Sequence, residues 1–395
     1  MGEEDSNPIF NENSKHEHLK VILFSEFPLS YPGGGERLIR LIYNHISKLS
    51  IDVRIIENTN KERPISASGR KPSPNIVRAE FKRFGLIKFL YQDLPPLGII
   101  PGDENAVSLI FLRRIPPRSI LHDLEKSNSK VVFCLHGIAI EKLRIANPFI
   151  IAHQILMRIK LRDLAKYTRN HIFLQSLLPP LTSYMIANGA DSNNIFTIEN
   201  EFESDVTFPE RNDKEFLVTF IGRIEDLQKG IKRLKKVTKY VGKFSRKIKF
   251  NIIGTGKDSG ILDGMDENVK ILSGIDDQNK NNIISSSNLA LITSNLDPYP
   301  RVVLEFLTSG VPVIATPASG PSYILGKDPS FGKVVSFSAK SLAMSIAGYY
   351  KEWANDKELY FSKRKDLYYS AREIFNSQKM LESYGNMIIQ VAAKN

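Results

Sequence analysis

Short apolar runs alternate with amphipathic stretches along most of the chain, and this alternation predicts parallel strands joined by helices. Residues 20–24 and 52–57 are typical of buried parallel strands, because apolar side chains dominate each short run. Between them, three glycines at 33–35 predict a tight turn, and the periodic stretch 37–49 predicts a helix. The order strand, glycine turn, helix, strand is that of a βαβ unit.

The same alternation continues through two halves of similar size. Central strands of the first half are predicted at residues 106–112 and 130–135. The second half has strands predicted at 215–221, 249–253, 269–272, 289–293 and 311–315, and helices at 338–353, 356–375 and 378–393. Ser338 is the expected N-cap of the first of these helices. We therefore predict an α/β protein with two doubly wound, Rossmann-like halves.

A chain of 395 residues is too long for one ordinary core, which agrees with two domains. The polar stretch 203–214, which contains Pro209, marks the boundary between them. We predict a disordered lead-in at 1–17, an N-terminal domain at 18–208, a C-terminal domain at 209–375, and a C-terminal helix at 376–395 that packs back on the N-terminal domain.

Composition narrows the setting and the partners. Cys134 is the single cysteine, which excludes an internal disulfide framework and a multi-cysteine zinc site. No run approaches the roughly 18 apolar residues that span a bilayer. The polar N-terminus lacks the apolar core of a secretory signal, so we expect a cytoplasmic protein. The net charge of +11 favours phosphorylated ligands, nucleic acid or an anionic membrane, and charge alone does not choose among them.

Residues 220–230 combine the features that a diphosphate site needs. A strand ends at Ile221, Gly222 permits close approach of the backbone, and Arg223 and Lys229 add two cations. A helix begins near Gly230 and offers free amides at its positive end. Fixed cations and N–H donors stabilise a leaving diphosphate. The alternative is a solvated helix N-terminus with ordinary surface cations.

A second stretch places two carboxylates near a predicted helix. Asp297 lies in a loop, Glu305 lies in the helix that follows, and Gly310-Val-Pro-Val comes next. Carboxylates in such positions are suited to bind hydroxyl groups of a ribose and a sugar. The alternative is that Asp297 is a helix N-terminal acid and that Glu305 is an incidental surface residue.

Together these stretches resemble the C-terminal half of the retaining family-four glycosyltransferases (glycosyl transferases group 1), which have the GT-B fold. That family carries a Gly-Arg pair, a lysine before a glycine, a Gly-x-Gly turn, a further glycine, and a Glu-x₇-Glu pair ahead of Gly-x-Pro-Val. The corresponding residues here are Gly222-Arg223, Lys229-Gly230, Gly254 with Gly256, Gly274, Asp297 with Glu305, and 310–313. Chance does not readily give all of these in order and at these spacings.

The N-terminal half resembles the same family more loosely. The glycines of the first turn, which are Gly33, Gly34 and Gly35, resemble the loop that lies under the donor phosphates. His136, before Gly137, resembles the histidine that contacts the transferred sugar. The alternative for His136 is a capped histidine at a strand end. Asn200 lies where the family has Asn-Gly, although Glu201 replaces the glycine.

The resemblance implies a GT-B architecture, in which two Rossmann-like doubly wound domains face a cleft. The acceptor would belong to the N-terminal domain, and the nucleotide sugar, with UDP as the expected nucleotide, to the C-terminal domain. The implied reaction moves a hexose from a nucleoside-diphosphate sugar to a hydroxyl with retention of anomeric configuration. No metal-ligand cluster stands out in the sequence, so we expect no essential divalent ion and no further cofactor.

The resemblance also implies roles for individual residues. Arg223 and Lys229 would stabilise the departing diphosphate, helped by backbone amides of the glycine turns. Glu305 would hold the nucleotide ribose, and Asp297 with His136 would position the sugar.

Two further points concern the same segment. Phe306 and Leu307, which follow Glu305, are included among the donor-binding residues. Asp297 departs from the family pattern, because the family has glutamate there and aspartate is shorter by one methylene. The departure puts the identity of the donor sugar in doubt more than the type of reaction.

The acceptor is less visible in the sequence. Residues 147–169 mix apolar side chains with arginines and lysines, and such a basic amphipathic stretch suits an anionic membrane that presents a lipid-linked acceptor. A basic loop at 63–71 and the cations Lys82, Arg83 and Lys88 add to that interpretation. The alternative is a helix that packs its apolar side on the sheet.

Three rival functions remain open at this point. A UDP-sugar epimerase-like GT-B enzyme would share the fold and the nucleotide site, although the segment 310–313 argues against it. A non-enzymatic polyanion-binding protein would explain the charge, but no nucleic-acid-binding motif is present, so we expect no nucleic-acid partner. A degenerate transferase that binds the donor without transfer would explain Asp297.

Overall fold

The computed structural model describes residues 19–26, 29, 34–49, 51–58, 76–79, 82–84, 92–94, 100, 105–112, 114–141, 148–200, 208 and 214–394. For residue 34 and for the strands between 76 and 94, only the backbone is described. The predicted lead-in at 1–17, Gly33, the loop at 63–71, Lys88, Glu201 and most of the boundary stretch 203–214 lie outside the described residues. So do the side chains of Lys82 and Arg83.

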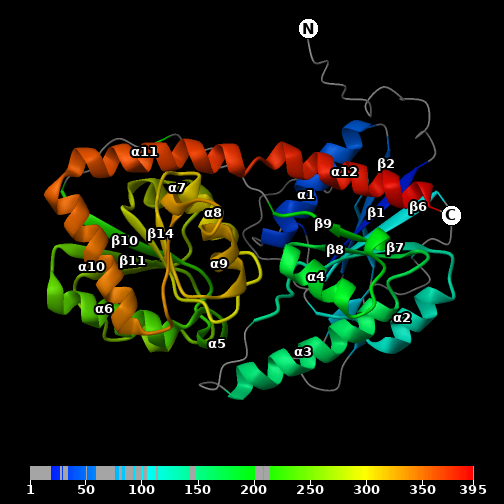
Figure 1. The fold of residues 1–395 in the computed structure, drawn as a ribbon, viewed down its shortest axis with the longest axis horizontal. Coiled ribbons are helices and arrows are strands. Elements are labelled where there is room, and N and C mark those ends of the chain that lie inside the picture. The colour runs from blue at the N-terminus through cyan, green and yellow to red at the C-terminus, as the bar shows by residue number, and fades with distance from the viewer. Residues whose placement is uncertain are drawn as a thin grey trace, which may run out of the picture. The chain divides into compact units, whose positions relative to one another are not determined.

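The chain forms two compact units, and each contains one parallel sheet (Figure 1). Unit 1 consists of Met1–Ile138, Met157–Ile198 and Leu381–Asn395. Unit 2 consists of Ala139–Leu156 and Glu199–Met380. The segment Ala139–Leu156 therefore belongs to unit 2, although the chain on either side of it belongs to unit 1.

The sheet of unit 1 has seven parallel strands in the order β3-β2-β1-β6-β7-β8-β9. They are β1 (Lys20–Ser25), β2 (Asp52–Asn58), β3 (Ile76–Ala79), β6 (Ala106–Phe111), β7 (Lys130–Cys134), β8 (Ile172–Ser176) and β9 (Ile195–Thr197). A separate antiparallel pair joins β4 (Lys82–Phe84) to β5 (Gln92–Leu94). Strands β6, β7 and β8 are buried along their whole length, as expected for a sheet covered on both faces.

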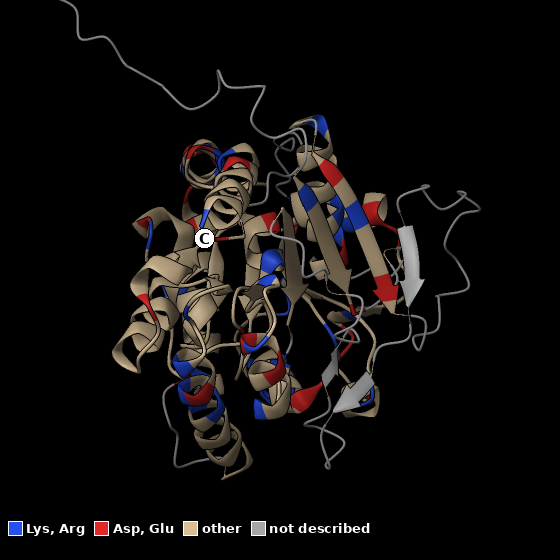
Figure 2. Ribbon diagram, turned by 90° about the vertical axis from the view of Figure 1, so that its right-hand side faces the viewer, with Lys and Arg blue, Asp and Glu red and all other residues tan. Residues whose placement is uncertain are grey.

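Helices α1 (Gly34–Ile46), α2 (Arg118–Glu125), α3 (Pro148–Lys166), α4 (Pro179–Ala187) and α12 (Ser377–Ala393) contribute residues to unit 1. Short 3₁₀ turns occur at Ser47–Leu49 and Ser192–Asn194. Figure 2 shows both signs of charge mixed over the helices on one side of the molecule. None of the helices in the described part of the chain is long and apolar enough to cross a bilayer.

The sheet of unit 2 has six parallel strands in the order β12-β11-β10-β13-β14-β15. They are β10 (Phe216–Ile221), β11 (Ile248–Ile253), β12 (Val269–Leu272), β13 (Leu289–Ile292), β14 (Val313–Ala315) and β15 (Gly332–Val334). The helices are α5 (Asp226–Lys229), α6 (Ile231–Phe244), α7 (Asp277–Ser286), α8 (Arg301–Leu307), α9 (Ser319–Leu325), α10 (Ala339–Asn355) and α11 (Lys357–Ile374). Short 3₁₀ turns occur at Ser259–Leu262 and Pro329–Phe331.

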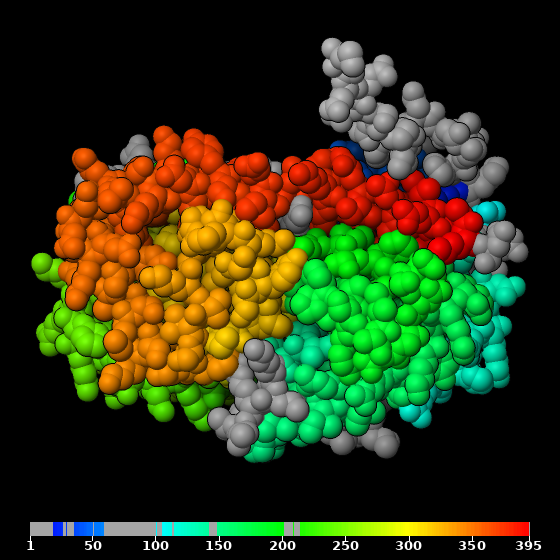
Figure 3. All heavy atoms as spheres, in the orientation of Figure 1, coloured from blue at the N-terminus to red at the C-terminus, as the bar shows by residue number. Residues whose placement is uncertain are grey.

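Strand β10 shows how both faces of this sheet are covered. Phe216 and Phe220 point into a buried apolar cluster that includes residues of α6 and α10. Thr219, between them, points to the opposite face and bonds Ser287 at the end of α7, with 2.6 Å between the hydroxyl oxygens. Alternate residues of one strand thus meet helices on opposite faces, which is the doubly wound arrangement. Helices α10 and α11 form part of the surface of unit 2 (Figure 3).

The predicted strands and the three C-terminal helices are confirmed, and each of their ends lies within two residues of the predicted one. Ser338 caps α10 by accepting a hydrogen bond from the amide of Ser341. The predicted helix at 37–49 was placed three residues too late, because α1 spans Gly34–Ile46 and a 3₁₀ turn follows at Ser47–Leu49. Strand β14 starts at Val313, two residues later than predicted. Strands β3, β4, β5, β8, β9 and β15 were not predicted.

Candidate functional site

The carboxyl ends of the strands in unit 2 bring the predicted site residues to one edge of the sheet. Gly222 follows β10, Gly254 follows β11, and the segment that leads to Asp297 follows β13. Ligands of open parallel sheets bind at this edge, because the turns after the strands are free to vary there. The edge therefore gathers the turns, cations and acids that the sequence singled out for this half.

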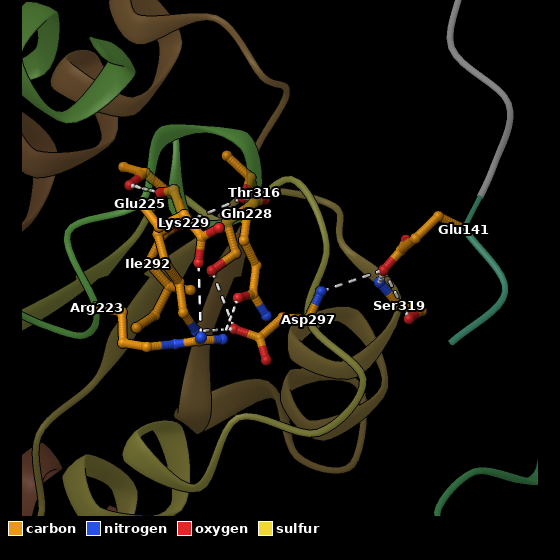
Figure 4. Close-up of polar contacts among 11 residues, drawn as sticks. Glu141, Arg223, Glu225, Gln228, Lys229, Ile292, Asp297, Thr316 and Ser319 are labelled. Carbon is orange, nitrogen blue, oxygen red and sulfur yellow. Dashed lines mark hydrogen bonds and ion pairs between the residues drawn. The ribbon is translucent and has the colours of Figure 1, made fainter. Parts of the chain in front are cut away.

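A buried ion pair lies at the centre of these residues (Figure 4). Lys229, the last residue of α5, donates from Nζ to Oδ2 of Asp297 over 2.7 Å. Their side chains are only 14% and 7% exposed. The hydroxyl of Ser294 donates to the same carboxylate oxygen over 3.0 Å. The interpretation of Lys229 as an ordinary surface cation is therefore wrong.

Asp297 is not a helix N-terminal acid either. Helix α8 begins at Arg301, and its first turn contains no acidic residue. Instead, Asp297 is 5% exposed and lies in the loop before the helix. Its carboxylate accepts hydrogen bonds from Lys229 of α5 and from Ser294 of the same loop, and such bonds offset the desolvation cost of a buried charge.

Arg223 supplies a second cation in a different environment. Its side chain is 65% exposed. It donates to Oε1 of Gln228 over 2.5 Å and lies 3.6 Å from Oε2 of Glu225. An exposed guanidinium with one close charged neighbour can reorient toward an anionic ligand at little cost. Figure 4 shows Arg223 and Lys229 pointing into the same region.

The Gly254-x-Gly256 turn packs directly against the Gly222-Arg223 turn. Gly254 has a φ of 153°, and a Cβ there would lie 1.9 Å from the carbonyl oxygen of Gly222. A Cβ at Gly256 would lie 2.3 Å from the carbonyl oxygen of Ile224. Only glycine permits this contact, so the two turns form one rigid unit.

The amides of these turns differ from what the resemblance implies. The amide of Gly222 donates to Ile253, and the amide of Gly254 donates to Leu272, both over 3.0 Å. These bonds extend the parallel ladder beyond the strand ends, so neither amide is free to bind a diphosphate. The expectation that these two amides help to hold the leaving group is corrected accordingly.

The remaining predicted residues of unit 2 lie near this edge or on α8. Gly274, which follows β12, has a φ of 66°, and a Cβ there would meet no described atom within 4 Å. Glu305 has a side chain that is 13% exposed, so it is not an incidental surface residue. Its two carboxylate oxygens lie 3.4 Å from Nζ of Lys280 on α7. Phe306 and Leu307 are fully buried, so their side chains belong to the core and only their backbone could reach a ligand.

Glu141 is a site residue that sequence reasoning missed. Its side chain is 2% exposed. The carboxylate accepts hydrogen bonds from the amide and the hydroxyl of Ser319, each over 2.9 Å, and from the amide of Asp297 over 3.4 Å (Figure 4). The amide of Glu141 in turn donates to Oε1 of Gln154 on α3 over 2.8 Å. Glu141 thus fixes the backbone of the loop that carries Asp297.

A second carboxylate holds the far end of the same loop. Glu199 accepts hydrogen bonds from the hydroxyls of Tyr299, over 3.0 Å, and Tyr323, over 2.6 Å. Lys327 places its Nζ 2.9 Å from the same carboxylate. Burial, followed by the bond to Glu199, raises the pKa of Tyr323 above its usual range, so its hydroxyl remains a donor. Residues 297–300 are therefore anchored at both ends.

The predicted residues of unit 1 form a separate group. Gly34 and Gly35 lie in the first turn of α1 rather than in a loop before it. His136 follows β7, and its Nε2 lies 2.9 Å from Oε1 of Gln175 and 3.1 Å from the hydroxyl of Tyr384. The imidazole is therefore bonded, as the capped-histidine interpretation requires, and that bonding leaves a ligand-binding role open.

Two observations bear on other ligands. Asn200 is 8% exposed, and within the described part of the chain its Oδ1 is buried without a hydrogen-bond partner. Its placement after β9 matches the position where the resemblance puts an asparagine. Among the described residues no group of three or more His, Cys, Asp or Glu side chains is arranged to hold a metal ion.

Comparison with known proteins relates the region that carries this site to a known family. Residues 201–374 match the family described as Glycosyl transferases group 1. The matched region includes β10 to α11 and thus the Lys229–Asp297 pair, Arg223 and Glu305. A search of curated protein sequences gave no match.

Solved structures are similar to the chain over nearly its whole length. Sucrose-phosphate synthase from Thermosynechococcus elongatus is 15% identical, with 95% of this chain and 100% of that chain covered and a TM-score of 0.71. WaaG, a glycosyltransferase involved in lipopolysaccharide biosynthesis, is 13% identical, with 93% and 99% covered and a TM-score of 0.64. HepE from Anabaena, solved with UDP and glucose, is 15% identical, with 94% and 99% covered and a TM-score of 0.61. These likenesses show the fold, which is GT-B with two Rossmann-like domains.

Proposed function

We propose that this chain, whose residues 201–374 match the glycosyl transferases group 1 family, is a glycosyltransferase that transfers a hexose from a UDP-sugar to a hydroxyl with retention of configuration. The observation that carries the proposal is the buried Lys229–Asp297 pair beside the exposed Arg223, at the carboxyl end of the sheet. The Anabaena HepE structures contain UDP, UDP and glucose, or UDP-glucose, which favours UDP as the nucleotide here.

The two cations would act on the leaving group. As the bond from the anomeric carbon to the diphosphate breaks, negative charge grows on the diphosphate oxygens, and fixed cations stabilise that charge more than the ground state. Lys229 is held by Asp297 before any ligand binds, so little reorganisation is needed. Arg223 is exposed and would turn toward the diphosphate from Gln228. The amide of Gly256 has no partner among the described residues, so this amide would be available to assist.

The acids would hold the parts of the donor that do not react. The carboxylate of Asp297, oriented by Lys229 and Ser294, would accept hydrogen bonds from hydroxyls of the sugar. Glu305 would accept them from the ribose, with Lys280 keeping its carboxylate in place. From unit 1, His136 would contact the transferred sugar. Such positioning contributes to the rate by holding the reacting atoms in line.

We propose that no divalent ion is essential, because two cationic side chains already face the expected diphosphate. Activity should therefore persist when a chelator is present. Loss of activity in chelator, with recovery on adding Mg²⁺ or Mn²⁺, would contradict this part of the proposal.

The proposed acceptor is lipid-linked and is presented at an anionic membrane face. Helix α3 supports it in part, because Ile155 and Ile159 are 46% and 49% exposed, and Arg162 and Lys166 on the same helical face are also exposed. The opposite side of α3 packs inward, with Leu161 fully buried, so the alternative of a packed helix is also confirmed for that side. WaaG, whose fold is similar, is itself involved in lipopolysaccharide biosynthesis.

Vesicle binding tests the membrane part separately. Wild type should co-sediment with vesicles that contain anionic lipid and not with neutral vesicles, and Ile155→Ser with Ile159→Ser should weaken the binding. Equal vesicle binding by the variant, or no vesicle binding by the wild type, would contradict the proposed membrane association. Either result would leave the proposed transfer reaction unaffected.

Product analysis tests the reaction itself. Incubation of the protein with UDP-sugars and hydroxyl acceptors should release UDP and give a glycoside whose anomeric configuration, read by NMR, equals that of the donor. An inverted product would contradict retention. Interconversion of the donor sugar without an acceptor would indicate the epimerase-like alternative, and donor binding without product would indicate a degenerate transferase.

A further inference from the structure

The turns that follow β10 and β11 in unit 2 are joined by backbone hydrogen bonds as well as by close packing of their glycines. The amide of Ile224 donates to the carbonyl of Thr255 over 2.9 Å, and the amide of Asp258 donates to the carbonyl of Ile224 over 3.1 Å. Lys257 lies between Thr255 and Asp258 in the sequence. Its backbone is therefore held beside the turn that carries Arg223.

One carboxylate bridges a cation from each of these two turns. Oε1 of Glu225 lies 3.1 Å from Nζ of Lys257, and Oε2 lies 3.6 Å from a guanidinium nitrogen of Arg223. The side chain of Glu225 is 26% exposed, whereas those of Lys257 and Arg223 are 67% and 65% exposed. Among the described residues, no other acid lies within 4.0 Å of either cation. Glu225 is therefore the counter-ion of both side chains.

The neighbouring acids have a different role, because they bond backbone amides. Asp226 accepts a hydrogen bond from the amide of Lys232, and Asp258 accepts one from the amide of Asp226, each over 2.7 Å. Glu225 immediately precedes α5, but its side chain makes no capping hydrogen bond to that helix. Asp226 and Asp258 thus stabilise the local backbone, while the carboxylate of Glu225 faces the two cations.

A carboxylate between two cations presents the same kind of oxygen pair as a phosphate group. Side chains that hold its two oxygens can instead hold two oxygens of a diphosphate, which carries more negative charge. The exchange costs little for Arg223 and Lys257, because exposed ion pairs are weak. The amide of Gly256, next to Lys257, adds a donor that has no partner in the described part of the chain.

We propose that Lys257 is a further cation of the donor site, and that Glu225 is an internal counter-anion which the diphosphate displaces from Lys257 and Arg223. The proposal rests on the proposed function, from which it takes the diphosphate. It goes further by assigning a cation that no motif of the sequence singled out and an acid that opposes ligand binding. Because this acid competes with the ligand, it weakens the affinity for UDP and favours release of UDP after transfer.

The dissociation constant of UDP, measured by isothermal titration calorimetry at low ionic strength, tests this proposal. Lys257→Gln should raise the dissociation constant by about tenfold, because a charge-assisted contact to the diphosphate is lost. Glu225→Gln should lower it by about threefold, because the competing charge is removed while the size of the side chain is kept. Salt should reduce both shifts, since the three side chains are accessible to solvent.

A matched pair elsewhere in unit 2 provides the control. Glu352 and Lys363 form an exposed ion pair with 3.6 Å between the charged atoms. Glu352→Gln and Lys363→Gln should leave the dissociation constant of UDP nearly unchanged. In the Lys257→Gln background, adding Glu225→Gln should lower the dissociation constant less than it does in wild type, because one of the two cations that it releases is absent. Chemical denaturation should show that all these variants fold with nearly the stability of wild type.

The outcomes separate this inference from the proposed function. If UDP binds and Lys229→Ala abolishes binding, while Glu225→Gln and Lys257→Gln leave the dissociation constant unchanged, the inference is overturned and the donor site remains. Weaker UDP binding by Glu225→Gln would also overturn the inference, because the acid would then assist the ligand rather than compete with it. Absence of UDP binding by the wild type would overturn the proposed function and this inference together.

Discussion

Nζ of Lys229 lies 2.7 Å from Oδ2 of Asp297, and both side chains are nearly excluded from solvent. The two residues are 68 positions apart in the sequence, with Lys229 at the end of α5, which follows β10, and Asp297 in the loop that follows β13. Lys229 is the cation proposed to stabilise the leaving diphosphate, and Asp297 is the acid proposed to bind the sugar. One contact therefore orients both side chains.

The ion pair should be visible as coupling between two mutations. Lys229→Met leaves a buried carboxylate with only part of its hydrogen bonding, and we expect it to lower the free energy of unfolding by about 3 kcal/mol. The double variant Lys229→Met with Asp297→Asn should recover part of that loss, because no unpaired charge remains. Chemical denaturation of the four proteins measures the coupling, and strictly additive effects would contradict a direct interaction.

Glu141 should affect binding of the donor sugar, although it lies far in the sequence from Asp297 and Glu305. Glu141→Ala removes the acceptor of the Ser319 and Asp297 amides and should lower the free energy of unfolding by about 2 kcal/mol. The KM for the donor should rise because the Asp297 loop loses its anchor. Glu352→Ala, which removes an exposed carboxylate near Lys363, is the control and should change neither quantity. An unchanged KM in Glu141→Ala would refute the anchoring role.

The glycine turn gives a steric prediction. A Cβ at Gly254 would lie 1.9 Å from a carbonyl oxygen, so Gly254→Ala should force the two turns apart and cost about 3 kcal/mol or more. At Gly260, a Cβ would lie 3.6 Å from its nearest neighbour, so Gly260→Ala should be nearly neutral. Thermal unfolding of both variants checks this, and comparable melting temperatures would show that the turns are not rigidly packed.

We expect Asp328 to make a pH-dependent contribution to the free energy of unfolding. The hydrogen bond from Ser370, on α11, is the main cause that holds the pKa of Asp328 below its usual value. A carboxyl group with a lowered folded-state pKa stabilises the protein above its unfolded-state pKa, and this contribution is lost as the pH falls through the folded-state pKa. The melting temperature of Asp328→Asn should therefore fall below that of wild type at neutral pH and approach it in acid. A difference that is independent of pH would exclude this linkage.

The periodic pattern was sufficient for the central strands of both units and for the three C-terminal helices, because buried parallel strands and amphipathic helices carry strong local signals. It was less informative for β9 and β15, which have only three residues each. The beginning of α1 was placed too late because Gly34 and Gly35 indicate a turn when only local preferences are considered.

The site was predictable where a motif brings residues together and not where the tertiary fold does. Lys229 and Asp297 stood out as isolated chemical types, but their pairing depends on the neighbouring positions of β10 and β13 in the sheet. Glu141 gave no local signal, because its partners Ser319 and Asp297 lie more than 150 positions away. The glycine amides were misjudged because a sequence does not show that a strand ladder extends beyond its last apolar residue.

Thermal unfolding in the presence of UDP and a panel of UDP-sugars tests the central claim most directly, with wild type, Lys229→Ala and the exposed-lysine control Lys236→Ala. A ligand at about one hundred times its dissociation constant adds roughly 2.7 kcal/mol to the free energy of unfolding. We predict that at least one UDP-sugar raises the melting temperature of wild type and of Lys236→Ala, and that Lys229→Ala loses the shift. No shift with any of these ligands, or an equal shift in Lys229→Ala, would contradict a donor site at the Lys229–Asp297 pair.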